Sequence, residues 1–140
     1  MIPYGKQELD EEDIDAVISV LKSDFLTQGP EVENFEDSFK SFVNSKHAIA
    51  VNSATSALHI SCLALGLGKD DIAWTSPNSF VASSNCALLC GAKVDFVDTE
   101  LENYNLDIDS LKAKLAQAKK EGSLPKVLIP VHFSGYPCDM

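Results

Sequence analysis

The segment Asn52-Ser53-Ala54-Thr55-Ser56-Ala57 carries three hydroxyl side chains between a short apolar run and a stretch with helical spacing. Small hydroxylic residues at the start of a helix let free backbone N–H groups and hydroxyls converge on one point, where the helix dipole favours an anion. The segment therefore predicts a phosphate site. The alternative is an ordinary N-cap formed by Ser53 or Thr55.

A second polar segment begins where the apolar run Ile72–Thr75 ends. Pro77 stiffens the turn after that run, and Phe80 opens the next stretch of helical spacing. An aromatic residue at a helix start, beside the carboxyl end of a strand, can cover the face of a planar ring. Plain packing of Phe80 is the alternative.

Other site motifs are weak. The sequence has no GxGxxG and no GxxxxGK[ST] pattern, which counts against a Rossmann dinucleotide site and a P-loop. Cys86 and Cys90 would share one face of a helix, but no CxxC pair or nearby histidine supports a metal site. We predict no metal, and we expect Cys62, Cys86, Cys90 and Cys138 to be small buried hydrophobes.

The charge balance of the chain argues against a nucleic-acid-binding function. The chain has 21 acidic residues against 11 basic ones, all of them lysine, for a net charge of −10. A nucleic-acid binder normally shows a basic stripe, which is missing here. Without arginine, backbone N–H groups and hydroxyls would have to hold any phosphate, unless a missing segment or a partner subunit supplies the arginine. The sequence also shows no signal peptide and no apolar run of about 20 residues, so we predict a cytoplasmic protein without a membrane partner.

The hydrophobic periodicity predicts the elements that position these segments. Helices are expected at residues 10–21, 31–43, 56–67, 79–90 and 108–120, and strands at 48–51, 72–75, 94–97 and 127–131. Strands that alternate with helices of this length indicate an α/β fold, with a mostly parallel sheet of about four strands and helices on both faces. Ligands bind at the carboxyl ends of strands in such sheets.

Six segments, in this order, resemble the DegT/StrS-type nucleotide-sugar aminotransferases, which use pyridoxal phosphate and have the fold-type I architecture. They are Ile2–Gly5, Phe25–Pro30, Val51–His59, Thr75–Pro77 with Phe80, Phe96–Asp98 and Pro130–Gly135. The resemblance covers the whole chain and implies the N-terminal part of the large domain of that fold.

The resemblance also implies roles for single residues. Thr55 and Ser56 fall where the family holds the cofactor phosphate, and Phe80 falls where an aromatic ring stacks on the pyridine. His132 falls at an active-site strand end, as a candidate wall residue; an ordinary loop histidine is the alternative. The positions implied for the sugar nucleotide are Tyr4, Asp24, Phe25, Leu26, Thr27 and Ala54.

The implied domains are a substrate-contacting arm with its helix at residues 1–30 and an incomplete cofactor domain at residues 31–140. In the family, the Schiff-base lysine and the aspartate that pairs with the pyridine nitrogen lie further along the chain. We therefore expect no catalytic residue here, and a fragment that is inactive by itself.

The resemblance implies a UDP-4-keto sugar and glutamate as substrates of the whole enzyme, and a homodimer. Two other hypotheses stay open. The chain could be a non-catalytic α/β nucleotide-binding module, or part of a sugar dehydratase of the same fold that uses the same cofactor.

Overall fold

The computed structural model describes residues 5–140, which form two compact units that divide between Ala50 and Val51. The first unit holds two helices, α1 (Glu11–Leu21) and α2 (Pro30–Phe42). Asp10 caps α1 because its carboxylate accepts the Asp13 N–H at 3.0 Å, while the Asp13 carboxylate accepts the Asp10 N–H at 3.2 Å. Both predicted helices are confirmed.

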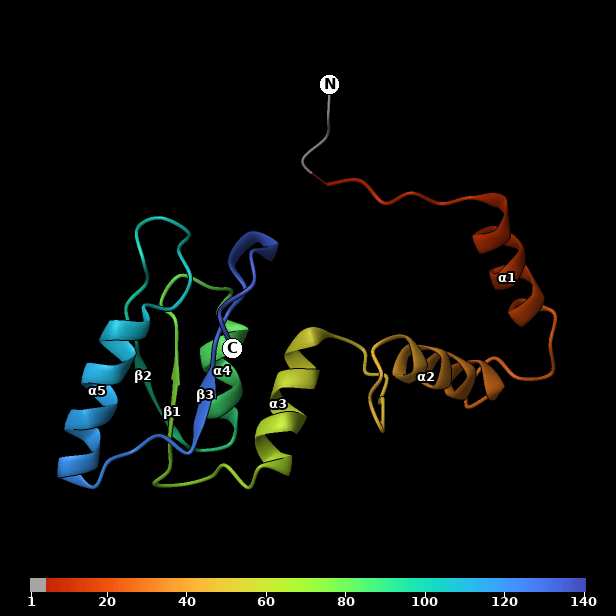
Figure 1. Cartoon of the computed structure of the whole chain (residues 1–140). Coiled ribbons are helices and arrows are strands. Elements are labelled where there is room, and N and C mark those ends of the chain that lie inside the picture. The colour runs from red at the N-terminus through yellow and green to blue at the C-terminus, as the bar shows by residue number, and fades with distance from the viewer. Residues whose placement is uncertain (1–4) are drawn as a thin grey trace. The chain divides into compact units, whose positions relative to one another are not determined.

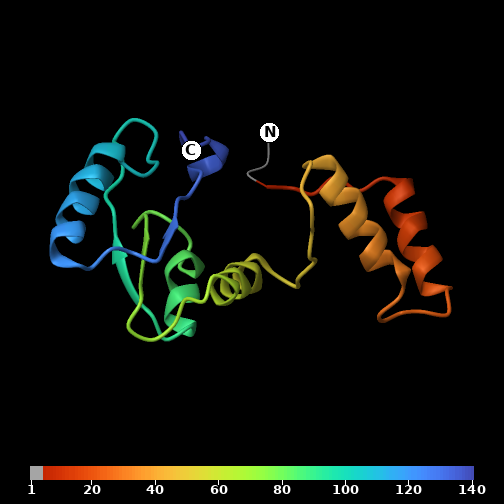
Figure 2. The same cartoon turned by 60° about the horizontal axis from the view of Figure 1, so that its bottom comes forward.

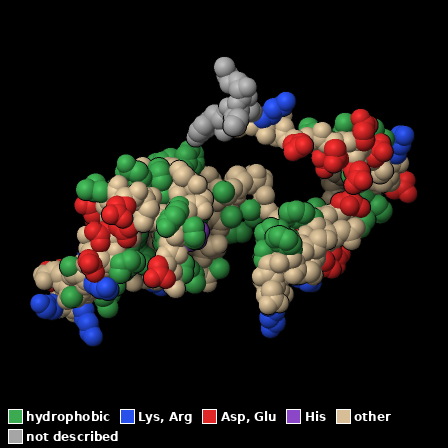
Figure 3. Space-filling model, turned by 45° about the horizontal axis from the view of Figure 1, so that its top comes forward, with side chains coloured by type: hydrophobic (Ala, Val, Ile, Leu, Met, Phe, Trp, Pro, Cys, Tyr) green, Lys and Arg blue, Asp and Glu red, His purple; other side chains and the backbone are tan. Residues whose placement is uncertain are grey.

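Neither helix of the first unit has a buried residue. The large apolar residues of these two helices keep much of their surface exposed, and Phe35 and Phe39 stack on each other at 6.0 Å between ring centroids. Apolar side chains are visible on the surface of both units, and acidic side chains gather over α1 (Figure 3).

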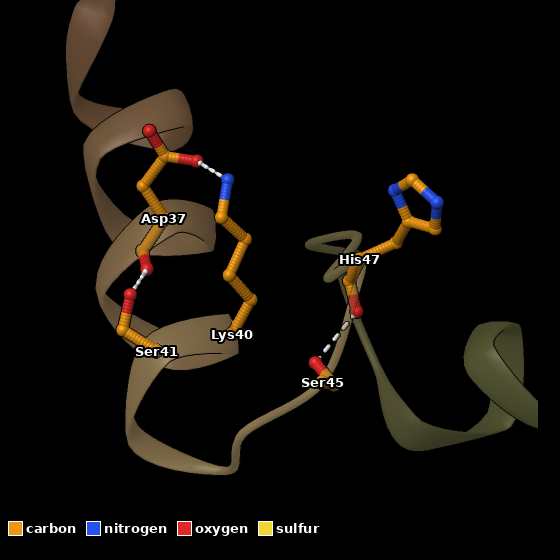
Figure 4. Close-up of polar contacts among 5 residues, drawn as sticks. All are labelled: Asp37, Lys40, Ser41, Ser45 and His47. Atoms are coloured by element: carbon orange, nitrogen blue, oxygen red, sulfur yellow. Dashed lines mark hydrogen bonds and ion pairs between the residues drawn. The ribbon is translucent and has the colours of Figure 1, made fainter.

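Local polar contacts lie within the last turns of α2 and, separately, within the chain that follows it (Figure 4). Lys40 pairs with Asp37 one turn earlier, and the Ser41 hydroxyl donates to the Asp37 carbonyl at 2.8 Å. Beyond the helix, the Ser45 hydroxyl donates to the His47 carbonyl at 2.9 Å, and the His47 imidazole points away from these groups (Figure 4). These contacts indicate that the segment from Asp37 to His47 has a structural role.

The second unit is built on a parallel three-stranded sheet of order β2-β1-β3, made of β1 (Ile72–Thr75), β2 (Lys93–Phe96) and β3 (Val127–Ile129). Helices α3 (Ala54–Ala64) and α4 (Ala82–Leu89) cover one face, and α5 (Ile108–Glu121) covers the other (Figures 1 and 2). A short 3-10 helix, η1 (Phe133–Gly135), follows β3. The α/β class with a parallel sheet and helices on both faces is confirmed.

Successive residues of β1 divide the core between the two faces, because side chains alternate along a strand. Ala73 packs with Cys62, Cys86 and Val127 on the side of α3 and α4. Trp74 packs on the side of α5, in a cluster completed by Val97, Leu106 and Ala118.

Lys114 of α5 covers the second cluster. Its ammonium lies 2.7 Å from the Asp95 carboxylate and 4.8 Å from the centre of the Trp74 ring. The hydrogen bond from Lys114 lowers the pKa of Asp95 below its ordinary value. The charge pair and the ring contact therefore fix α5 against β1 and β2.

The predicted strand at residues 48–51 is wrong. Within residues 5–140 this segment pairs with no strand, and Ile49 is 75% exposed. A strand needs a neighbour for its ladder, and none of the three described strands pairs with this segment. The Ala50 N–H instead donates to the Glu36 carboxylate at 2.7 Å.

The cysteine prediction is confirmed for two residues and wrong for two. Cys62 and Cys86 are buried, with their sulfur atoms 3.8 Å apart, whereas Cys90 and Cys138 are half-buried. Burial raises the pKa of the Cys62 thiol to about 11, and the neighbouring Cys86 adds to the shift. Such thiols are inert packing groups. In residues 5–140, no helix combines the length and apolar character that crossing a membrane requires.

Candidate functional site

The start of α3 is held by an N-cap and a small hydroxyl network. The Ser53 hydroxyl accepts the Ser56 N–H at 3.2 Å and lies 3.1 Å from the Ser56 hydroxyl. The Ser56 hydroxyl also donates to the Asn52 side-chain oxygen at 2.6 Å. Ser53 is therefore the N-cap, and the alternative that Thr55 caps the helix is wrong.

The cap leaves donors free for a ligand. Among residues 5–140, the N–H groups of Ala54 and Thr55 meet no acceptor, and the Thr55 hydroxyl forms no hydrogen bond. The first turn of α3 has no acidic residue that would compete for these groups. Two amides and one hydroxyl at a positive helix end form a donor set that fits a phosphate.

Thr55 and Phe80 line the same hollow, which has a volume of about 450 Å³. The remaining lining residues come from α4 and the residue before it, and they are Val81, Ala82, Asn85, Leu88 and Leu89. Phe80 is 75% exposed and belongs to neither core cluster. Thr55 therefore shares one hollow with an uncovered aromatic ring, and this combination suits a phosphorylated aromatic ligand.

The position of Phe80 differs slightly from the expectation. Helix α4 begins at Ala82 and not at residue 79, so Phe80 lies in the loop before the helix. The Ser79 and Ser83 hydroxyls lie 2.7 Å apart across this start. The loop leaves the Phe80 ring free of the helix packing.

The carboxyl end of β1 carries a further polar group that the sequence analysis did not single out. The Thr75 hydroxyl donates to the Ile129 carbonyl at 2.9 Å and joins β1 to β3. Ser76 is only 2% exposed, and its hydroxyl has no partner among the described residues. Two features of the sequence could have identified Ser76: its hydroxyl side chain and its position directly after a strand. A buried hydroxyl of this kind needs a partner such as a water, an ion or a ligand group.

The residues predicted to contact a sugar nucleotide fall in both units. Asp24, Phe25, Leu26 and Thr27 form the exposed loop between α1 and α2, and the Phe25 N–H donates to the Ser23 hydroxyl at 3.2 Å. Ala54 is exposed at the first position of α3, next to Thr55. Tyr4 lies outside the described residues. The roles of all six stay predictions.

The site contains neither a lysine nor a metal cluster. No lysine lines the hollow of Thr55 and Phe80. In the part of the chain that the structure describes, no three histidine, cysteine or acidic side chains are grouped so that they could hold a metal ion. His132 is exposed and lies three residues beyond the end of β3. The arrangement can bind an anionic, planar ligand but offers no covalent anchor for it.

Comparison with known proteins gives one consistent result. The sequence profile described as the DegT/DnrJ/EryC1/StrS aminotransferase family matches residues 7–140. The UDP-4-amino-4,6-dideoxy-N-acetyl-beta-L-altrosamine transaminase of Campylobacter jejuni is 44% identical over 117 residues, which are 84% of this chain and 31% of that protein. The chain spans about one third of the length of the curated relatives it matches.

Solved structures agree in fold. Helicobacter pylori PseC, an aminotransferase involved in the biosynthesis of pseudoaminic acid, superposes with a TM-score of 0.83 at 31% identity. That match covers 98% of this chain and 36% of PseC. The PLP-form of Spr1654 from Streptococcus pneumoniae superposes with a TM-score of 0.84 at 26% identity, over 99% of this chain and 34% of that one.

The different roles of Ser53, which caps the helix, and Thr55, whose hydroxyl is free for a ligand, can be tested. Ser53→Ala should lower the free energy of unfolding by about 0.5–2 kcal/mol, because it removes the N-cap. Thr55→Ala should leave stability nearly unchanged, since its hydroxyl makes no bond within the described chain. Urea denaturation of the two variants and the parent provides the measurement. Equal losses in the free energy of unfolding for the two variants would show that Thr55 belongs to the cap and is not free to bind a ligand.

Proposed function

Because the chain belongs to the DegT/DnrJ/EryC1/StrS aminotransferase family, we propose that it forms the N-terminal third of a nucleotide-sugar aminotransferase that depends on pyridoxal phosphate. One observation carries the proposal: Thr55, beside unused helix-start donors, and the exposed ring of Phe80 line a single hollow. The family match and the PLP-form of a structural relative support the choice of cofactor.

The residues present fit the cofactor. The N–H groups of Ala54 and Thr55 and the Thr55 hydroxyl bind the phosphate, while the Ser56 hydroxyl holds the helix start through Asn52 and has a smaller direct part. Phe80 covers one face of the pyridine ring and excludes water from it. Once bound, pyridoxal phosphate would supply the electron-withdrawing ring that makes the transfer of an amino group from donor to acceptor possible.

The chain meets the phosphate without arginine. All 11 basic residues are lysines, and none of them lines the hollow. Neutral donors at the positive end of α3 therefore carry the interaction within this part of the protein. The lysine that holds the cofactor and the aspartate that pairs with the pyridine nitrogen belong, in this proposal, to the part of the enzyme beyond these 140 residues.

The proposed substrates are a UDP-4-keto-6-deoxy-N-acetylhexosamine and glutamate, in the biosynthesis of pseudaminic acid. The names of the Campylobacter and Helicobacter relatives support this choice. The loop Asp24–Thr27, together with Tyr4 and Ala54, contacts the sugar nucleotide. The whole enzyme acts in the cytoplasm as a homodimer. In the proposed division of the chain, residues 1–30 serve as the arm and residues 31–140 as the cofactor domain.

The activity itself is testable in the full-length protein that carries this chain. Glutamate and the UDP-4-keto sugar should give 2-oxoglutarate and the UDP-4-amino sugar in equal amounts, measured by chromatography and mass spectrometry. The 140-residue chain alone should give neither product, because it lacks the covalent anchor. A 3-deoxy sugar in place of the amino sugar would favour the dehydratase, and binding of the nucleotide without any turnover would favour the non-catalytic module.

The phosphate site gives a sharper prediction. In the full-length protein, Thr55→Ala should weaken the binding of pyridoxal phosphate by about 1.5–3 kcal/mol, because a hydrogen bond to a charged group is lost. The double change Thr55→Ala with Ser56→Ala should cost roughly 2–5 kcal/mol, less than the sum of the single losses, since the backbone donors remain.

Pyridoxal without its phosphate is the control for that measurement. Its affinity should barely respond to either variant in an equilibrium titration. If pyridoxal and its phosphate lose affinity equally, the Asn52–Ala57 segment is only a helix start and the phosphate binds elsewhere.

Substitutions of Phe80 test the part of the hollow that is proposed to bind the pyridine ring. Phe80→Ala should weaken cofactor binding by about 1–3 kcal/mol, through lost apolar burial and ring contact. Phe80→Trp should retain binding, because a larger ring can cover the same face. The exposure of Phe80 predicts that neither change lowers the free energy of unfolding much. Unchanged cofactor affinity in the alanine variant would remove Phe80 from the site.

A further inference from the structure

Asn105 holds the segment that follows β3. Its side chain makes two hydrogen bonds to backbone groups about 30 residues further along the chain: Nδ2 donates to the Tyr136 carbonyl at 3.1 Å, and Oδ1 accepts the Phe133 N–H at 2.9 Å. Asn105 is only 4% exposed. A buried amide with both ends satisfied fixes the position of the backbone that it binds.

The loop that carries Asn105 is itself fixed. The Asn105 N–H donates to the Asn103 side-chain oxygen at 2.8 Å, and its carbonyl accepts the Glu100 N–H at 2.9 Å. Tyr104 adopts a positive φ of 61°, and its ring lies 5.7 Å from that of Phe133. The side chain of Asn105 is therefore aimed at the segment after β3 before any ligand binds.

His132 directly precedes Phe133, whose N–H group is bound by Asn105. Its Nδ1 atom accepts the Cys138 N–H at 3.0 Å, and the Cys138 thiol donates to the Val131 carbonyl at 3.3 Å. A ring nitrogen that accepts a hydrogen bond carries no proton, so the neutral imidazole has its hydrogen on Nε2. The closed turn from residue 132 to 138 thus selects one tautomer of His132.

The turn lies at the carboxyl edge of the sheet. His132 follows the end of β3 by three residues, and the Thr75 hydroxyl of β1 binds the last carbonyl of β3. Ligands bind at this edge in open parallel sheets. His132 is exposed, so its Nε2–H group is available as a donor.

We propose that Asn105 is a positioning residue for His132, and that His132, at the carboxyl edge of the sheet, is a neutral Nε2–H donor to an anionic or carbonyl oxygen of a bound ligand. The nature of the ligand rests on the proposed function, whereas the tautomer and its dependence on Asn105 do not. Asn105 fixes Phe133 and Tyr136, and those residues keep Cys138 within reach of the His132 ring.

The test is nitrogen-15 NMR of the full-length protein without cofactor, with labelled histidine and the His132 signals assigned from a His132→Gln variant, in mildly alkaline buffer where imidazoles are neutral. His132 should show an unprotonated Nδ1 and a protonated Nε2. His47 and His59 are internal references, since no hydrogen bond fixes either ring among the described residues. The chemical shifts of the two His132 nitrogens are a readout that stability alone does not move.

Two variants of Cys138 form a matched pair. Cys138→Pro removes the N–H donor and should convert His132 to the tautomer mixture of a free imidazole. Cys138→Ala retains the N–H group and should leave the single tautomer in place. Equal spectra for the two variants, or a mixture in the parent chain, would overturn the assignment of His132.

Two variants of Asn105 test the positioning role. Asn105→Ala should give the tautomer mixture and speed amide exchange at Phe133 by about two- to tenfold, the equivalent of one lost hydrogen bond. Asn105→Asp retains the acceptor for the Phe133 N–H and should keep that amide protected. An unchanged His132 tautomer in a folded Asn105→Ala chain would refute the role of Asn105. If Asn105→Ala fails to fold, a single His132 tautomer in folded Asn105→Asp with an unprotected Phe133 amide would refute it equally.

These spectra use no cofactor and no substrate, so their outcome is independent of the activity assay. A chain with the predicted tautomer but without transamination in the full-length protein would contradict the proposed function alone. An active enzyme with a mixed tautomer would contradict only this inference.

Discussion

The central position of β1 is the constraint on which the site depends. Because β1 pairs in parallel with β2 and with β3, its carboxyl end opens between the ends of two neighbours. The polypeptide leaving β1 supplies Ser76 and Phe80, and the Thr75 hydroxyl joins that end to β3. The same strand places Ala73 and Trp74 in opposite core clusters, so the packing that stabilises the sheet also fixes the edge where a ligand would bind.

The second constraint is electrostatic. A chain with a net charge of −10 and no arginine has few ways to bind a phosphate. The start of α3 provides one, because Ser53 and Asn52 satisfy the Ser56 groups and leave the amides of Ala54 and Thr55 without an acceptor among the described residues. Separating the capping residue from the ligand-binding residue keeps the helix stable whether or not the anion is present.

Local signals were sufficient for most of the fold. Apolar spacing located five helices, and strands β1, β2 and β3 fell close to their predicted places. The run at 48–51 failed because strand formation depends on a partner, which local composition does not report. The hollow of Thr55 and Phe80 was anticipated in its parts, while their proximity required the packing of α3 on α4. Asn105 was missed, since contacts across some 30 residues leave no periodic signal. Ser76 lies within the predicted Thr75–Pro77 segment, but the burial that leaves its hydroxyl without a partner among the described residues depends on tertiary packing.

The most direct test of the central claim is a crystal structure of the full-length protein with pyridoxal phosphate bound. Our account predicts the phosphate within hydrogen-bonding distance of the Ala54 and Thr55 amides and the Thr55 hydroxyl, with the Phe80 ring stacked on the pyridine. A phosphate bound at another place, with the start of α3 facing solvent, would contradict it.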